Sequence, residues 1–131
     1  MTHAGGKPHA NVGDRSQRYE IRATGYPKQG ESVIGWSNDI DGAEKMASAI
    51  RKAPGCICIV IFDRQEGRGI MIKVVITNEE IAGTYFAQEI IASKLRAAGI
   101  PMASNQLRPT KGTLLRVDDP DNHRIIYTWR Q

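Results

Sequence analysis

The feature that most constrains the fold is an unbroken apolar run, Cys56–Phe62, near the middle of the chain. A short run rich in β-branched residues is typical of a strand that is buried on both faces. A second apolar run, Ile70–Thr77, follows the polar, glycine-containing segment Arg64–Gly69. The two runs predict a central β-hairpin with a six-residue connection, around which the rest of the chain packs.

Two strands are predicted on each side of this hairpin. Their ranges are Tyr19–Thr24, Ser32–Ser37, Thr113–Asp118 and Arg124–Trp129. Apolar and polar residues alternate along the first strand, as expected for a half-buried strand. In the second strand, the same alternation places Ile34 and Trp36 on one face. The last two strands are joined by Asp119–Asn122, a run of turn-forming residues.

Helical spacing of apolar residues predicts two helices. The first follows the N-cap candidates Ser37–Asp39 and ends before Pro54. The second begins at Thr77 and Glu80, which have the spacing of a capping box, and ends at Gly99. Its apolar positions are Ile81, Tyr85, Phe86, Ile90, Ile91 and Leu95.

The predicted order of elements is β-β-α-β-β-α-β-β, an α+β fold with a mostly antiparallel sheet. Strands two to five with both helices give the order of a split βαβ, or ferredoxin-like, core, with an extra strand flanking it at each end. Such a core places both helices on one face of the sheet. The alternative is two pseudo-symmetric halves, ββαβ at residues 18–66 and βαββ at residues 67–131. We expect residues 18–131 to form a single domain, preceded by a flexible tail at residues 1–17.

The central strands are apolar on both faces, which has a consequence for assembly. If two helices cover only one face, the apolar residues of the other face need a flanking strand, a second subunit or a binding partner. We therefore expect a homodimer and a protein partner.

Charge and cysteine content indicate the class of protein. The net charge of +4, from 18 Lys and Arg against 14 Asp and Glu, is small for a nucleic-acid-binding protein. No apolar run approaches the roughly 20 residues of a membrane span, and the polar first residues do not resemble a secretory signal. Cys56 and Cys58 are one residue apart on a strand and cannot easily close a disulfide. These features favour a cytoplasmic protein that does not associate with membranes.

No arrangement of residues indicates catalysis. The sequence has no Ser-His-Asp set, G-x-S-x-G motif, P-loop or G-x-G-x-x-G motif. A structural zinc site needs four Cys or His ligands, and no histidine has ligand-like spacing to Cys56 and Cys58. We expect no cofactor, no metal and no enzymatic activity.

A basic set near the end of the chain is the candidate binding site. It consists of Arg108, Lys111, Arg116, Arg124 and Arg130. Alternation on the last strand places Arg124 and Arg130 on the face opposite Tyr127 and Trp129. If the aromatic residues face the core, these arginines face solvent beside the loop that carries the first two members. Such a face suits an acidic protein surface or nucleic-acid phosphates, or is a solvated polar face.

Two long stretches carry a resemblance to known proteins. They are YEIRATGYPKQGESVIGWSNDIDGAEKMASAIRKAPGC, and MIKVVITNEEIAGTYFAQEIIASKLRAAGIP together with the closing IIYTWRQ. These stretches resemble small uncharacterised proteins from proteobacterial phages and other mobile elements. The resemblance implies an accessory protein that obstructs a host defence complex by binding it.

Three functions follow from the sequence, in order of preference. The first is a non-enzymatic binding protein that acts through a protein–protein surface, as an anti-defence inhibitor would. The second is a nucleic-acid-binding protein that uses the C-terminal basic face. The third is a small hydrolase or transferase, because a fold can host a catalytic site that leaves no local motif.

Overall fold

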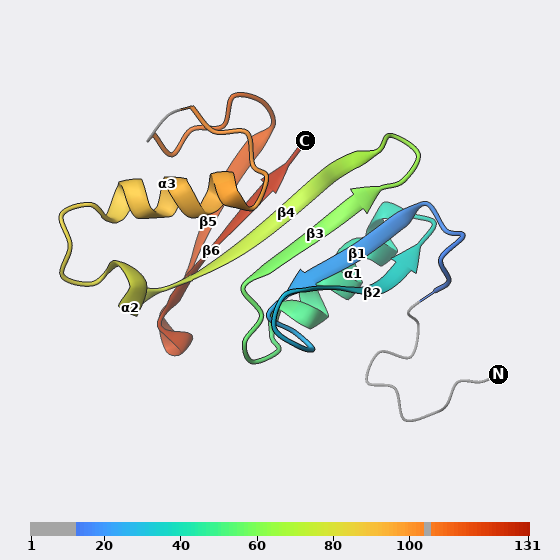
Figure 1. The fold of residues 1–131 in the computed structure, drawn as a ribbon, viewed down its shortest axis with the longest axis horizontal. Helices are drawn as coiled ribbons and strands as arrows, with labels where there is room; N and C mark the ends of the chain where they lie inside the picture. The colour runs from blue at the N-terminus through green and yellow to red at the C-terminus, as the bar shows by residue number, and fades with distance from the viewer. Residues whose placement is uncertain (1–12, 104–105) are drawn as a thin grey trace.

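The computed structural model describes residues 13–103 and 106–131, which form one six-stranded antiparallel sheet with three helices (Figure 1). The strands are β1 (Tyr19–Thr24), β2 (Glu31–Ser37), β3 (Cys58–Asp63), β4 (Arg68–Thr77), β5 (Thr113–Asp119) and β6 (Arg124–Arg130). The helices are α1 (Ile40–Arg51), α2 (Asn78–Ile81) and α3 (Ala87–Ala97), and a short 3-10 turn, η1 (Pro120–Asn122), joins β5 to β6. The predicted α+β class and the order of strands and helices are confirmed.

The strand order across the sheet, β2-β1-β3-β4-β6-β5, divides into two halves that meet at the β3–β4 hairpin. In the first half, α1 connects β2 to β3, with β1 paired antiparallel to both. In the second half, α2 and α3 connect β4 to β5, with β6 paired antiparallel to both. Each half therefore contains one split βαβ connection. The strands that pair within each half are the ones expected from the alternative of two pseudo-symmetric halves.

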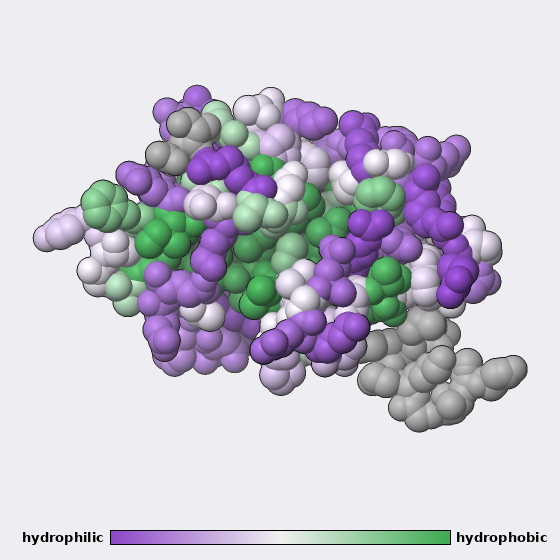
Figure 2. All heavy atoms as spheres, in the orientation of Figure 1, coloured by the Kyte–Doolittle hydropathy of each residue, from purple (hydrophilic) through white to green (hydrophobic). Residues whose placement is uncertain are grey.

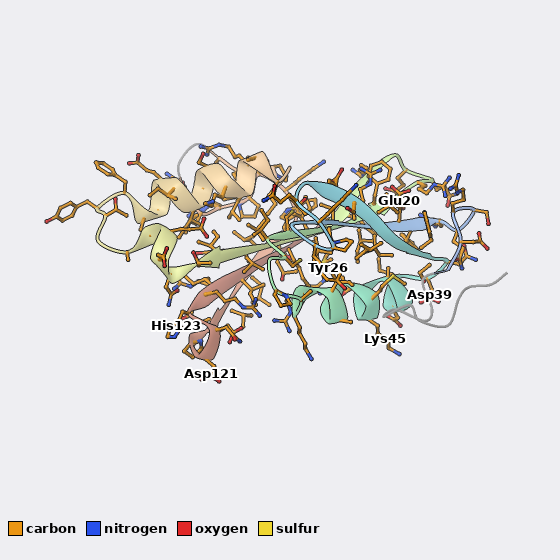
Figure 3. The ribbon with its side chains drawn as sticks, turned by 60° about the horizontal axis from the view of Figure 1, so that its bottom comes forward. Glu20, Tyr26, Asp39, Lys45, Asp121 and His123 are labelled. Atoms are coloured by element: carbon orange, nitrogen blue, oxygen red, sulfur yellow. The ribbon has the colours of Figure 1, made fainter. Side chains whose placement is uncertain are left out.

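The two long helices lie on opposite faces of the sheet, so the prediction that both share one face is wrong. Ile59 and Ile61 of β3 pack in the cluster that contains α1, together with Met71 of β4. The next residue along β4, Ile72, packs with Leu95 in the cluster that contains α3. Neighbouring residues on a strand point to opposite faces. Figure 3 shows α3 above the sheet and α1 below it.

The handedness of strand connections explains this arrangement. A helix that connects two parallel strands lies on the face that makes the crossover right-handed. Both connections step in the same direction across the sheet, from β2 to β3 and from β4 to β5. Because β3 and β4 are antiparallel, the same handedness places the two helices on opposite faces. A ferredoxin-like core would have required the second connection to step back towards the first strand.

The second predicted helix is divided into α2 and α3. The capping box is confirmed: the Thr77 hydroxyl accepts the Glu80 backbone N–H, and the Glu80 carboxylate accepts the Thr77 backbone N–H at 2.7 Å. The chain then leaves the helix after Ile81, and Gly83 adopts a positive φ of 70° that favours glycine. No helix in the described residues is long and apolar enough to cross a membrane.

One smaller expectation is wrong at the N-terminal end, namely that Ile34 and Trp36 share a face of their strand. Ile34 of β2 is the extra residue of a bulge and has no partner in β1. The bulge reverses the alternation of side chains along β2, so Ile34 packs with the α1 cluster while Trp36 lies on the other face beside Glu20. Of the predicted flexible tail, residues 1–12 lie outside the described part of the chain. Residues 13–17 form a turn in which the Gln17 N–H donates to the Asp14 carbonyl at 3.0 Å.

Candidate functional site

The predicted basic set does not form one surface. Tyr127 and Trp129 are buried in the α3 cluster, so Arg124 and Arg130 lie on the α1 side of the sheet. The expectation that both arginines face solvent is wrong for Arg124, whose side chain is only 16% exposed because it is held against Asp119. Arg116 is paired directly opposite Tyr127 and therefore lies on the α3 side. Arg108 and Lys111 are exposed in the segment between α3 and β5. The arginines of β5 and β6 thus point to opposite faces.

Three of the five basic residues are held by carboxylates. Arg116 contacts Asp118 at 2.9 Å, Arg124 contacts Asp119 at 2.9 Å, and Arg130 contacts Glu44 of α1 at 2.6 Å. The hydrogen bonds from Arg130 lower the pKa of Glu44, and the hydrogen bond from Arg124 lowers the pKa of Asp119. These pairs reduce the positive charge that a phosphate backbone would meet.

We predict that the chain binds duplex or single-stranded DNA no more tightly than about 10⁻⁵ M at physiological salt, which is the non-specific range. The reason is the small net charge of +4 and the pairing of the strand arginines with carboxylates. A gel-shift titration at several salt concentrations measures this affinity. Nanomolar binding that disappears in the Arg124→Ala, Arg130→Ala double variant would contradict the prediction.

A different surface results from the opposed helices. Because α3 covers the β4–β6 part of its face, none of the described helices covers β1 and β2 there, and of β3 only Cys58 and Val60 pack against the α3 cluster. The uncovered surface is formed by β1, β2 and the adjacent side of β3. We call this surface the open face. Register places the following side chains on it: Glu20, Arg22, Thr24, Glu31, Val33, Trp36, Cys58, Val60 and Phe62. Figure 2 shows apolar surface between α3 and β1, bordered by hydrophilic residues.

Arg22 is fixed at the centre of the open face by its neighbours. Its guanidinium carbon lies 4.1 Å from the centroid of the Phe62 ring, and its Nε donates to Glu20 at 2.7 Å. The indole N–H of Trp36 donates to the other Glu20 oxygen at 3.3 Å. Burial raises the pKa of Glu20, but hydrogen bonds from Arg22 and Trp36 outweigh it and leave the pKa below its ordinary value. The cation and the two rings therefore form one ordered group.

A groove runs from the open face to the C-terminal end of α3. Arg22, Arg68 and Lys111 bring three basic side chains to it from β1, β4 and the segment before β5. The other lining residues are Glu31, Val60, Gly69, Ile72, Ala98, Gly99, Pro101, Trp129 and Gln131. A Cβ at Gly69 would lie 3.3 Å from the Val60 side chain, so a larger residue there would fill the floor. The groove thus combines a mostly apolar floor with cationic sides.

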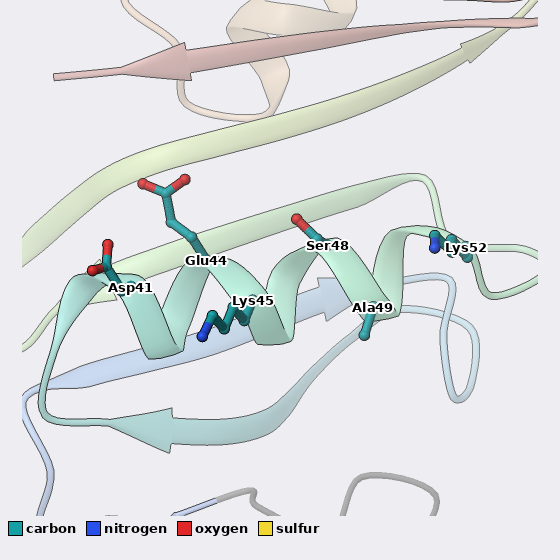
Figure 4. A pocket seen from close by; sticks show the side chains of 6 residues that line it. All are labelled: Asp41, Glu44, Lys45, Ser48, Ala49 and Lys52. Carbon is teal, nitrogen blue, oxygen red and sulfur yellow. The ribbon is translucent and has the colours of Figure 1, made fainter.

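A second hollow runs along the outer side of α1 and is less suited to a specific ligand. Its lining residues are Asp41, Glu44, Lys45, Ser48, Ala49 and Lys52. Figure 4 shows these side chains along the helix, with Glu44 pointing toward β4. Its charges are of both signs and its only apolar side chain is Ala49, so we do not assign it a ligand.

The two cysteines are free, with Cys56 buried in the α1 cluster and Cys58 on the open face. Burial raises the pKa of the Cys58 thiol to about 12, so this thiol stays protonated at neutral pH and is a poor nucleophile. No group of three or more His, Cys, Asp or Glu side chains among the described residues could hold a metal ion.

Sequence reasoning included Lys111 but missed Arg22 and Arg68. The alternation of β1 did place Arg22 on its polar face, together with Glu20. Nothing local in the sequence indicates that β4 and the segment before β5 approach that face. No protein-family model, no curated protein and no solved structure matches the chain.

Proposed function

We propose that the chain is a non-enzymatic binding protein that holds an acidic segment of a partner protein in the groove of its open face. The observation that carries this proposal is the convergence of Arg22, Arg68 and Lys111 over a mostly apolar floor. Glu31 is the one carboxylate side chain among the described lining residues. Arg22 and Arg68 are paired at their outer sides with Glu20 and Glu66, and Lys111 has no carboxylate partner among the described residues. An acidic peptide with apolar side chains complements both properties.

The ordered group around Arg22 supports a protein partner. Tryptophan and arginine are the residue types that most often dominate the energy of protein–protein interfaces. Arg22 is already held by Glu20 and Phe62, so binding would cost little side-chain entropy. Its side chain remains partly exposed and can reach a ligand.

The resemblance to proteins of phages and mobile elements supplies a setting for this activity. An accessory protein that obstructs a host defence complex acts by occupying a surface and needs no catalytic group. In that setting, the bound segment would belong to a component of the host complex and would carry Asp or Glu beside apolar residues.

A random peptide display library tests the chemistry of the groove without knowledge of the partner. Panning on the immobilised protein should enrich acidic peptides that contain apolar residues. The Arg68→Glu, Lys111→Glu double variant should lose at least about tenfold in affinity for them, because like charges then face the peptide. The Lys45→Glu, Lys52→Glu variant makes the same change of charge on α1 and serves as the matched control.

Two outcomes would contradict the proposal. Enriched peptides that lack acidic residues would mean that the groove does not select for charge. Equal loss of affinity in the groove variant and in the α1 variant would mean that net charge, rather than the groove, attracts the peptides.

A further inference from the structure

Among the described residues, β2 and β5 form the two edges of the sheet, and they differ in how well they are protected from pairing. β2 contains a bulge, a feature that commonly disrupts further strand pairing at a sheet edge. β5 pairs with β6 in unbroken register along its whole length and contains neither a bulge nor a proline. Within the described residues, the backbone of β5 bonds to no strand other than β6. The outer edge of β5 is therefore a regular template for another strand.

Apolar side chains of β5 are exposed beside this edge. Leu115 is 57% exposed and Val117 is 48% exposed, both on the α1 side of the sheet. Val117 is paired opposite Ile126, which is paired opposite Val75. Val75 and Ile126 are buried but belong to neither helix cluster. An apolar row thus crosses three strands, buried at Val75 and Ile126 and exposed at Val117, where it reaches the open edge.

We propose that β5 pairs antiparallel with β5 of a second copy of this chain, about a two-fold axis at Val117. In this register, Arg116 of each copy lies directly opposite Asp118 of the other, on the α3 side. Opposite charges at such cross-strand positions are stabilising, and like charges are destabilising. The two Val117 side chains meet on the α1 side and join the two apolar rows into one surface.

The charges of β5 select this register over its neighbour. An axis at Arg116 would place the two Arg116 side chains opposite each other, which like-charge repulsion disfavours. The axis at Val117 instead gives an alternating ring of two arginines and two aspartates. Within one chain, Arg116 and Asp118 already lie 2.9 Å apart and are exposed, so both can contribute to this ring. The homodimer expected from the sequence would then use the edge of the sheet rather than its central strands.

Sedimentation of the purified chain at micromolar concentration tests the proposal, with a dimer expected. Arg116→Asp places aspartates opposite aspartates, and Asp118→Arg places arginines opposite arginines. Each variant alone should weaken the dimer by about tenfold or more. An equimolar mixture of the two should recover dimers, because every opposed pair in the mixed dimer again has opposite charges. Lys45→Asp, an exposed charge reversal on α1, should dimerise like the original chain.

Three results would overturn the proposal. A strict monomer at micromolar concentration would show that the β5 edge does not pair. Variants that dimerise as well as the original chain would place the interface elsewhere. Failure of the mixture to recover dimers, with both variants folded by circular dichroism, would exclude the proposed register. The peptide display test of the groove does not require the chain to form a dimer. The outcome of the sedimentation experiments is therefore independent of whether the proposed function is right.

Discussion

Replacing Leu95 with alanine should lower the free energy of unfolding by about 3 kcal/mol, because the side chain is fully buried and its loss leaves a cavity. Leu95 lies on α3 and belongs to the same buried cluster as Ile72, Val74 and Trp129 of the sheet. Urea unfolding followed by circular dichroism measures the change. A loss below about 1 kcal/mol would mean that α3 is not docked on the sheet in this way.

The same experiment can test whether the two clusters are independent. Ile50, also fully buried, lies on α1 at the opposite face, and Ile50→Val should cost about 1 kcal/mol. Since Leu95 and Ile50 share no cluster, their effects should add to within about 0.5 kcal/mol in the double variant. A larger coupling would indicate one continuous core, as in an arrangement with both helices on one face.

The local patterns of the sequence were reliable where a single element determines them. Alternation located β1, the apolar runs located β3 and β4, and a run of turn-forming residues separated the two predicted strands that became β5 and β6. The runs are apolar on both faces for a reason that the structure makes clear. The α1 cluster takes Ile59 and Ile61, while Val60 packs against the α3 cluster on the other side.

The arrangement of the elements could not be predicted because it depends on long-range pairing. The order β-β-α-β-β-α-β-β is compatible with either direction of the second crossover, and that direction decides which face α3 covers. No local residue pattern records it. Likewise, Tyr85 and Phe86 have helical spacing with Ile81, yet both are exposed outside the helices. Their spacing was misleading because the chain leaves the helix before reaching them.

The candidate site shows the same division. Composition and alternation identified the basic residues of β6 and their orientation relative to Tyr127 and Trp129. Two other facts depend on tertiary contacts and could not be predicted. Glu44 of α1 forms an ion pair with Arg130 of β6. Arg22, Arg68 and Lys111, which are far apart in the sequence, line the same groove.

One carboxylate that the sequence did not distinguish, Asp63 at the end of β3, is 2% exposed and anchors the first half of the sheet. Arg18 donates to both of its oxygens, at 2.9 and 2.7 Å. The backbone N–H groups of Gln65 and Glu66 donate to it as well, within the turn of the central hairpin. Asp63 thus connects the start of β1 to the β3–β4 turn.

Replacing Asp63 with alanine should lower the free energy of unfolding by about 2 kcal/mol at neutral pH, because a buried acceptor of several hydrogen bonds is lost. The expected loss is moderate because Arg18 is 38% exposed, and solvent weakens its attraction. Asp121→Ala, at an exposed position in η1, should change stability by no more than about 0.5 kcal/mol. An equally small effect of Asp63→Ala would show that the pair with Arg18 does not hold the hairpin.

The dependence on pH gives a sharper test with Asp63→Asn. Hydrogen bonding to Arg18 lowers the pKa of Asp63 to about 2, whereas an aspartate in an unfolded chain has a pKa of about 3.9. The folded state therefore binds fewer protons between these values, and the stabilisation is complete above about pH 4 and is lost as the pH falls toward 2. Unfolding curves should show the original chain losing this advantage over Asp63→Asn across that window. A stability difference between the two chains that stays constant from neutral pH down to pH 2 would mean that the ionised carboxylate contributes nothing to the fold.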